Sequence, residues 1–310
     1  MTIAVLLATY NGEQFLSAQL ESLLRQTYTD FTIYVSDDFS TDSTNEIIKE
    51  YSEKYPTKII NLPNKYRFGN ARDNFLSLIN RVDADCYLFC DQDDVWNSEK
   101  MEILCNEYQK HPKDIPTLIY SDLTVVDKNL CIINSSFISM MNLSKDTTWK
   151  KLLIQNSITG CTLLINKPLA DLYKSNINTI INENIIMHDH FFALLASIFG
   201  KIYFIDRPLI KYRQHETNSV GAKNVKAFSY IIQKIKKIQD GKNLIKQTEV
   251  QAGELLKTFP ETMKNNIIYS TIESYYHLTS KPKLYKCIFL IKNNLLKNSF
   301  GRIIFQFLTI

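Results

Sequence analysis

The stretch "VLLATYNGEQFLSAQLESLLRQTYTDFTIYVSDDFSTDST" (residues 5–44) contains an apolar run, a polar turn, an amphipathic segment and a second apolar run that ends in two aspartates. Apolar residues 3–8 predict a strand, and leucines at helical spacing predict a helix over residues 15–25. A second strand is expected over residues 31–36. Two strands joined by a helix are typical of a βαβ unit with parallel strands.

The same alternation continues beyond residue 44. A helix is expected over residues 43–55, opening with the capping-box pattern Ser43-x-x-Glu46. Further strands are expected at residues 59–62, 86–90, 117–127, 160–166, 201–206 and 208–215, and further helices at residues 70–82, 98–111 and 187–200, the last with Gly200 as C-cap. The sequence therefore predicts an α/β fold with a mostly parallel sheet flanked by helices. Ligands of such sheets bind at the carboxyl ends of the strands.

Acidic residues gather at those predicted strand ends. The segment "CDQDDVW" (residues 90–96) follows the fourth strand, and "DDFSTD" (residues 37–42) follows the second. Together they would bring six carboxylates to one edge of the sheet: Asp37, Asp38, Asp42, Asp91, Asp93 and Asp94. Such a cluster is costly unless a cation or hydrogen-bond donors offset its charge. One interpretation is a site for Mg2+ or Mn2+, which prefer oxygen ligands.

Two other interpretations of "CDQDDVW" are a solvated turn and a phosphatase nucleophile. "YLFCDQDDV" fits the hhhhDxDxV pattern of haloacid-dehalogenase-like phosphatases, with Asp91 as nucleophile and Asp93 as acid/base. In those enzymes the motif lies on the first strand of the domain, whereas two or three βα units precede it here. A dinucleotide-dependent oxidoreductase is disfavoured because the eight glycines form no G-x-G-x-x-G.

The charge is divided unevenly along the chain. Residues 1–220 carry 21 Lys+Arg against 27 Asp+Glu, and residues 221–310 carry 15 against 5. We therefore expect two regions, a catalytic α/β domain over residues 1–220 and a basic helical region over residues 221–310. The basic region is either a solvated lysine-rich face or the binding surface for an anionic partner.

The cysteine pattern and the first residues suggest the compartment. The six cysteines form no C-x-x-C pair and several lie in apolar runs, so we expect buried thiols in a reducing compartment. The N-terminus lacks the basic start of a signal peptide, and no apolar stretch reaches the roughly 18 residues of a transmembrane helix. A cytoplasmic protein is expected.

Taken together, the ordered motifs resemble the opening of the family 2 glycosyltransferases. That pattern is an apolar strand, a T-Y-N turn, a helix ending L-x-Q-T, a second strand, D-D-x-S-x-D, and then a D-x-D-type motif at about the distance of "DQDD". The resemblance covers about residues 3–215. It implies the GT-A fold, a Rossmann-like sheet, and inverting transfer of a sugar from a nucleotide-diphosphate donor with Mn2+ or Mg2+ as cofactor.

The same resemblance implies roles for individual residues. Contacts to the nucleotide sugar are implied for Thr9, Tyr10, Glu13, Asp37, Asp38, Arg72, Asp91 and Asp93, with Asp38 accepting a hydrogen bond from a uracil or thymine ring and Arg72 facing the diphosphate. Metal ligation is implied for Asp93 and Asp94, and for His215 in "YRQH", which is otherwise an ordinary polar loop residue.

The general base is expected at Asp189 in "MHDHFF", at the start of the helix over residues 187–200. A carboxylate at a helix N-terminus is stabilised as the anion, which suits a group that must accept a proton. Asp189 could also act as a simple N-terminal cap.

The motif combination is most similar to bacterial enzymes of polysaccharide assembly, rhamnosyltransferases among them. The expected donor is UDP- or dTDP-linked, and the expected acceptor is a hydroxyl of a cell-surface polysaccharide or lipid-linked oligosaccharide. The C-terminal region mixes lysines with large apolar residues, as in segments that lie on the inner face of the plasma membrane, and it equally fits a packed appendage or a dimer surface. No nucleic-acid partner is expected.

Overall fold

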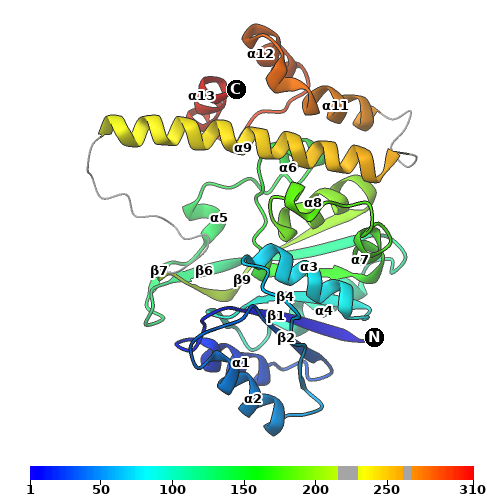
Figure 1. Cartoon of the computed structure of the whole chain (residues 1–310), viewed down its shortest axis with the longest axis vertical. Coiled ribbons are helices and arrows are strands. Elements are labelled where there is room, and N and C mark those ends of the chain that lie inside the picture. The colour runs from blue at the N-terminus through cyan, green and yellow to red at the C-terminus, as the bar shows by residue number, and fades with distance from the viewer. Residues whose placement is uncertain (216–229, 261–266) are drawn as a thin grey trace.

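The computed structural model describes residues 1–215, 230–260 and 267–310 and confirms the expected α/β class (Figure 1). The predicted boundary at residue 221 lies outside these residues. The first half contains β1 (Ile3–Thr9), α1 (Leu16–Leu24), β2 (Thr32–Asp37), α2 (Thr44–Lys54), β3 (Ile59–Asn61), α3 (Ala71–Arg81), β4 (Cys86–Asp91), β5 (Val95–Trp96), α4 (Lys100–Gln109) and β6 (Thr117–Val126). The second half contains β7 (Ile132–Asn134), α5 (Phe137–Met140), α6 (Trp149–Ile154), β8 (Leu163–Asn166), α7 (Lys167–Lys174), α8 (His188–Phe199), β9 (Lys201–Arg213), α9 (Tyr230–Thr258), α11 (Ile267–Tyr276), α12 (Lys283–Lys292) and α13 (Phe300–Thr309).

The strands form one mixed sheet in the order β3-β2-β1-β4-β8-β6-β9-β5, with β7 paired to β6. Strands β1 to β4 are parallel, so the loops after β1, β2 and β4 meet at one edge. The register places Thr9 beside Asp37 and Ala8 beside Asp91, which brings the motif loops together.

Alternate residues of β1 pack into two separate hydrophobic clusters, as the period of two in a strand requires. Ala4 and Leu6 pack with α3, α7 and α8, whereas Val5 and Leu7 pack with α1, α2 and α4. The sheet is therefore covered by helices on both faces, which explains why its strands are apolar throughout.

The second half of the sheet departs from the prediction in three places. The strand expected over residues 160–166 begins with a short 3-10 turn at Gly160–Thr162, and only Leu163–Asn166 form β8, which pairs antiparallel with β4 and β6. The two strands expected at residues 201–206 and 208–215 are one strand, β9, whose pairing with β6 shifts register near Asp122. Gly200 does follow α8 but is not left-handed: a Cβ there would meet the Pro116 carbonyl oxygen at 1.7 Å, so close packing explains this glycine.

The helix over residues 43–55 begins where the capping box predicts, but the cap is different. Ser43 makes no side-chain capping bond. Instead, Oδ1 of Asp42 accepts a hydrogen bond from the backbone N–H of Thr44 at 3.1 Å, because the preceding loop turns Asp42 back toward the first helical turn. The prediction of position was correct and the prediction of the capping contact was wrong.

The basic C-terminal region is helical, as expected, and α9 lies between the α/β body and the helices α11, α12 and α13 (Figure 1). Ala252 and Leu255 of α9 belong to the same hydrophobic cluster as α3 and α8, so the region shares the core of the body. No helix within the described residues combines the length and apolarity needed to span a bilayer. Four cysteines are buried, but Cys131 is exposed and Cys287 is partly exposed, which corrects the expectation for those two.

Candidate active site

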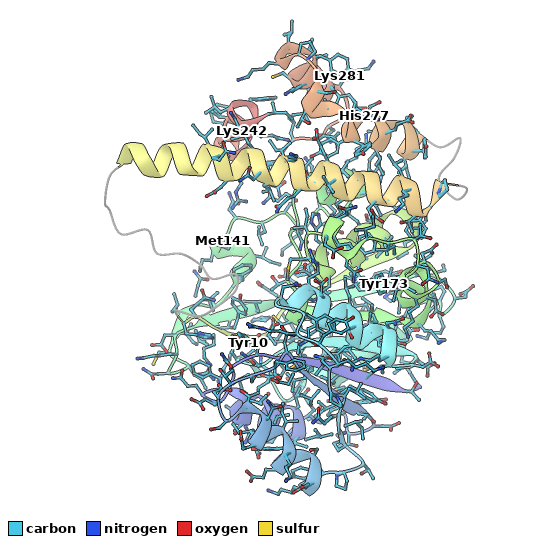
Figure 2. All side chains as sticks on the ribbon, in the orientation of Figure 1. Tyr10, Met141, Tyr173, Lys242, His277 and Lys281 are labelled. Carbon is cyan, nitrogen blue, oxygen red and sulfur yellow. The ribbon has the colours of Figure 1, made fainter. Side chains whose placement is uncertain are left out.

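A cleft of about 1020 Å³ runs from the carboxyl ends of β1, β2 and β4 to the C-terminal helices. Tyr10 and Met141, labelled in Figure 2, belong to its two ends. One end, the sheet end, is lined by the motif loops. The other, the helical end, is lined by α5, the segment after α6, α9 and α13. Of the predicted residues, the cleft lining includes Thr9, Tyr10, Asp38, Asp91, Asp93, Asp189 and His215.

The first two aspartates of "DDFSTD" organise the loops around the sheet end. Asp37 accepts hydrogen bonds from the Thr9 hydroxyl at 2.8 Å and from the Ser40 backbone N–H at 2.7 Å, which ties β1 to the loop after β2. Asp38 accepts hydrogen bonds from the backbone N–H groups of Phe68 and Gly69. Each Asp38 oxygen keeps a second lone pair, so this residue fixes the Phe68–Gly69 turn and still faces the cleft.

Tyr10 is held at the end of β1 by a reciprocal pair of hydrogen bonds with Gln92 of "DQDD". Its backbone N–H donates to Gln92 Oε1 at 2.8 Å, and Gln92 Nε2 donates to its carbonyl oxygen at 2.9 Å. A Cβ at Gly12 would meet Gln92 Oε1 at 2.3 Å, so only glycine leaves room for this pair. The Arg67 guanidinium packs over the Tyr10 ring and donates to its hydroxyl at 2.6 Å.

Glu13 and Arg72 lie outside the cleft lining. Oε2 of Glu13 accepts the Ser43 backbone N–H at 3.0 Å, at the start of α2. Arg72 makes two hydrogen bonds of 2.9 Å to Asp73 and donates to the Ile185 carbonyl at 2.8 Å. The structure therefore places Arg72 as a link between α3 and the segment before α8, and it places Arg67, which the motif comparison missed, in the cleft.

The three aspartates of "DQDD" have different surroundings. Asp93 Oδ2 lies 2.8 Å from Nε2 of His215, and both side chains face the cleft. Asp94 is fully buried beneath them: its Oδ1 accepts the Arg213 backbone N–H at 3.1 Å, while its Oδ2 has no partner among the described residues. Asp91 lines the cleft at the end of β4.

Burial and mutual repulsion raise the pKa of two of these carboxyl groups. Burial, then Asp93 and Asp189, raise the pKa of Asp91 to about 7, and burial, Asp93 and Asp91 raise that of Asp94 well above its usual range. One buried cation near these carboxyl groups is Arg213, whose Nε donates to the Asp93 carbonyl at 2.7 Å, and another is Lys100, whose ammonium donates to the Cys161 carbonyl at 2.7 Å. Burial lowers the pKa of Lys100 to about 7, so it offsets the acidic cluster only in part.

This cluster fits a hard divalent cation. One ligand atom from each of Asp91, Asp94 and Cys161 lies within 4.8 Å of the others, and the orphaned Asp94 Oδ2 is a buried acceptor that a cation would satisfy. Burial raises the pKa of the Cys161 thiol well above its usual range, so it stays protonated and is a poor ligand for Mg2+ or Mn2+. The available donors are therefore the carboxylates, with His215 beside Asp93.

Asp189 lies in the first turn of α8, as predicted, and lines the same cleft. Its Oδ1 accepts the His190 backbone N–H at 2.6 Å, and the side chain of Asn156 also hydrogen bonds to it. Burial outweighs these hydrogen bonds and raises its pKa to about 6. Such a carboxyl group is ionised at neutral pH yet basic enough to accept a proton, which is what a general base requires.

Two features of the cleft had no signal in the sequence motifs. Lys297 and Arg302 line its helical end, and Ser157 and Gln155 contribute buried oxygens without partners among the described residues. The uneven charge of the chain indicated an anionic partner for the C-terminal region, but no pattern indicated that two of its cations enter the same cleft as Asp189.

Sequence comparison identifies the family to which this fold and cleft belong. Residues 4–173 match glycosyl transferase family 2, and the chain belongs to that family. It is 33% identical over 223 residues to the dTDP-rhamnosyl transferase RfbG of Shigella flexneri, covering 70% of this chain and 74% of that protein. It is 28% identical over 173 residues to the Escherichia coli glucosyltransferase WfgD, named for a GlcNAc-diphosphoundecaprenol acceptor, covering 54% of this chain and 62% of WfgD.

Solved structures confirm the GT-A-like fold. Residues 1–349 of Staphylococcus aureus TarS in complex with UDP-GlcNAc align with a TM-score of 0.58 at 18% identity, over 94% of this chain and 79% of that one. The mannosyltransferase PcManGT of Pyrobaculum calidifontis in complex with GDP-Man and Mn2+ aligns with a TM-score of 0.55 at 14% identity, over 94% of this chain and 72% of that one. The chain is a glycosyltransferase acting on nucleotide sugars, and the phosphatase alternative is left without support.

Proposed function

We propose that this protein is an inverting glycosyltransferase that uses a UDP- or dTDP-linked sugar, rhamnose being one candidate, and a hydroxyl of a cell-surface polysaccharide or lipid-linked oligosaccharide. The observation that carries the proposal is that one cleft contains both the "DQDD" carboxylates and Asp189, close enough for Asp189 to raise the pKa of Asp91. Similarity to RfbG supports the dTDP-rhamnose donor.

The reaction follows from this arrangement. Asp189 accepts the proton of the acceptor hydroxyl as its oxygen forms a bond to the anomeric carbon. The bond from that carbon to the diphosphate oxygen breaks on the opposite face, so the configuration inverts. Thr9, Tyr10, Asp37 and Asp38 shape the nucleotide end, and Arg67 is the nearby cation for the diphosphate.

A divalent cation, Mn2+ or Mg2+, would be held by Asp93 and Asp94, with Asp91 and His215 beside them. Asp94 would supply its orphaned Oδ2 from beneath, and Asp93 and His215 would approach from the cleft. Bound there, the ion supplies positive charge next to the leaving diphosphate. The complex of PcManGT with Mn2+ supports a metal in this class of fold.

Calorimetric titration of UDP, dTDP and GDP, each with and without Mn2+, tests the donor site. We expect one nucleotide diphosphate to bind, and Mn2+ to strengthen its binding. Asp93→Asn should remove the Mn2+ effect, whereas Asp114→Asn, which changes an exposed aspartate outside the cleft, should keep it. Failure of all three nucleotides to bind would overturn the proposal. Inversion is tested by NMR of the anomer first released when the bound donor is slowly hydrolysed.

We also place the C-terminal helices against the anionic inner face of the plasma membrane, which makes this cytoplasmic protein peripheral. Residues 274–310 contain no carboxylate and carry five lysines and one arginine. Large apolar side chains of α12 and α13 are exposed: Leu284, Tyr285, Ile288, Ile291, Phe300, Ile304 and Leu308. Apolar side chains among cations fit the interface of an anionic bilayer.

Co-sedimentation with liposomes tests this placement. The protein should bind vesicles containing phosphatidylglycerol more strongly than phosphatidylcholine vesicles, and Leu284→Ser with Phe300→Ser should weaken that binding. Equal binding to both vesicles, or a stable dimer in light scattering that the double variant disrupts, would contradict it.

A further inference from the structure

The helical end of the cleft carries positive charge where the sheet end carries negative charge. Among the described cleft-lining residues the carboxylates are Asp38, Asp91, Asp93 and Asp189, all at the sheet end or at α8. The helical end is lined by Lys297 and Arg302 together with apolar side chains of α5, α9 and α13. A negatively charged ligand group is therefore favoured at the helical end, where no carboxylate of the described residues lines the cleft.

Lys297 has no counter-charge among the described residues. Neither a carboxylate nor a hydrogen-bond acceptor contacts its ammonium there, and the charged group that perturbs it is Arg302, a second cation. Burial, then Arg302, lowers the pKa of Lys297. A half-buried ammonium beside a guanidinium is unfavourable unless an anion joins them.

The backbone around Lys297 is fixed in place. Its N–H donates to Gln306 Oε1 at 3.0 Å, and Gln306 Nε2 donates to the Leu295 carbonyl at 2.9 Å, so one buried amide of α13 holds both sides of the segment. Arg302, from the first turn of α13, donates to the carbonyls of Met141 and Asn142. The Lys297 backbone and the Arg302 guanidinium are therefore held in place, which reduces the entropic cost of binding an anion.

The segment after α6 connects this basic pair to the general base. Lys151 of α6 donates to the Leu296 carbonyl at 2.8 Å, and Asn156 hydrogen bonds to Asp189. Gln155 precedes Asn156 in the chain, and Ser157, which is 6% exposed, follows it. Gln155 Oε1 and Ser157 Oγ have no partner among the described residues, although both residues line the cleft. Buried polar atoms of this kind usually meet a ligand or water.

We propose that the helical end of the cleft is an anion subsite, in which Lys297 and Arg302 bind a phosphate or diphosphate group carried by the acceptor. The inference rests on the proposed function, because it assumes that the acceptor enters between Asp189 and α13. Ser157 and Gln155 then hydrogen bond to the acceptor saccharide, whose hydroxyl reaches Asp189. The acceptor phosphate comes either from a prenyl diphosphate carrier or from a polymer of polyol phosphates.

Binding of a short-chain probe to the full-length protein tests the subsite. The protein is first saturated with Mn2+ and whichever nucleotide diphosphate binds it, so that the donor diphosphate site is filled. Geranyl diphosphate, geraniol and sn-glycerol 3-phosphate are then titrated by calorimetry. We expect geranyl diphosphate to bind and geraniol to bind at least tenfold more weakly, since a charge-assisted hydrogen bond contributes about 1.5–3 kcal/mol. Stronger binding of glycerol phosphate than of geranyl diphosphate would assign the polymer as the source.

Variants show whether the probe binds at this end of the cleft. Lys297→Gln should weaken geranyl diphosphate about tenfold or more and leave nucleotide affinity unchanged. Lys292→Gln, which removes an exposed lysine of α12 outside the cleft, is the matched control and should bind both ligands normally. Lys297→Gln should fold normally because its ammonium has no partner to lose among the described residues, whereas Arg302→Gln also removes two hydrogen bonds to the carbonyls of Met141 and Asn142, the two residues after α5.

Two outcomes would overturn the subsite. The first is that neither anionic probe binds the nucleotide-saturated protein. The second is that both probes bind Lys297→Gln as tightly as they bind the unaltered chain. Failure of every nucleotide to bind in the first step would instead overturn the proposed function, so the two failures are distinguished.

Discussion

The carboxyl groups of Asp91 and Asp189 lie close enough that the charge of Asp189 raises the pKa of Asp91, although one ends β4 and the other begins α8. This proximity joins the donor motif to the proposed general base in one cleft. We expect Asp189→Asn to lower donor hydrolysis and sugar transfer by about 10²- to 10⁴-fold. The asparagine oxygen can still accept the His190 N–H, so the fold and nucleotide affinity should be kept. Unchanged turnover in this variant, measured by nucleotide release, would exclude Asp189 as the base.

The rate should depend on pH through the same residue. Burial raises the pKa of Asp189 to about 6, and only its ionised form accepts a proton. The rate is therefore expected to rise as the pH increases through about 6 and to level off above about 7. A pH profile of turnover at saturating donor measures this. An acidic limb centred near pH 4, the range of an ordinary exposed aspartate, would show that the catalytic group is a different one.

Replacing Arg67 should lower nucleotide affinity, and replacing Arg72 should lower thermal stability. Arg67→Ala removes an exposed cation that contacts Tyr10, so we expect nucleotide affinity to fall about tenfold with an unchanged melting temperature. Arg72→Ala breaks the contacts to Asp73 and to the Ile185 carbonyl, so we expect a lower melting temperature with unchanged nucleotide affinity. Calorimetry and thermal denaturation separate the two. The reverse pattern would restore Arg72 as the diphosphate contact that the family motif implies.

Gly12 should be needed for the position of the loop after β1. An alanine Cβ would lie 2.3 Å from Gln92 Oε1, so Gly12→Ala should displace Gln92 and release the Tyr10 backbone. We expect weaker nucleotide binding, similar to that of Gln92→Ala, and a double variant no worse than either single one. Gly301→Ala is the control, because its Cβ would have no heavy atom within 4 Å. Additive losses in the double variant would show that the two residues act separately.

Much of this architecture could be predicted from local patterns. The continuous apolar run of residues 3–8, the helical spacing of leucines and the polar residues after each apolar run identified β1, α1, β2 and β4 almost to the residue. The order of motifs along parallel strands then placed Asp38, Asp91 and Asp93 at one edge, because those strands end on the same side. These inferences depend only on residues that are close to one another in the sequence.

The same patterns did not predict side-chain direction in loops. Arg72 and Arg67 differ by five positions, and the motif comparison favoured Arg72 for the diphosphate, whereas Arg67 lines the cleft. The Tyr10 hydroxyl and the Ile185 carbonyl, both from other segments, decide which way the two guanidinium groups turn. The capping contact predicted for Ser43 is not made either, and the neighbouring Asp42 accepts the N–H of Thr44, the first residue of the helix.

The sequence by itself determined the class of fold, the family and the motif loops around the donor, because each depends on residues close together in the chain. Tertiary structure alone decided that the buried Lys100 interacts with Asp91 and Asp94, that Asp94 is buried with an oxygen unpartnered among the described residues, and that Lys297 and Arg302 line the same cleft as Asp189. Those relationships join segments that no local pattern connects. They arise because α9 packs against the body through Ala252 and Leu255 and against α13 near Phe305 and Thr309, and this packing carries the C-terminal cations to the cleft.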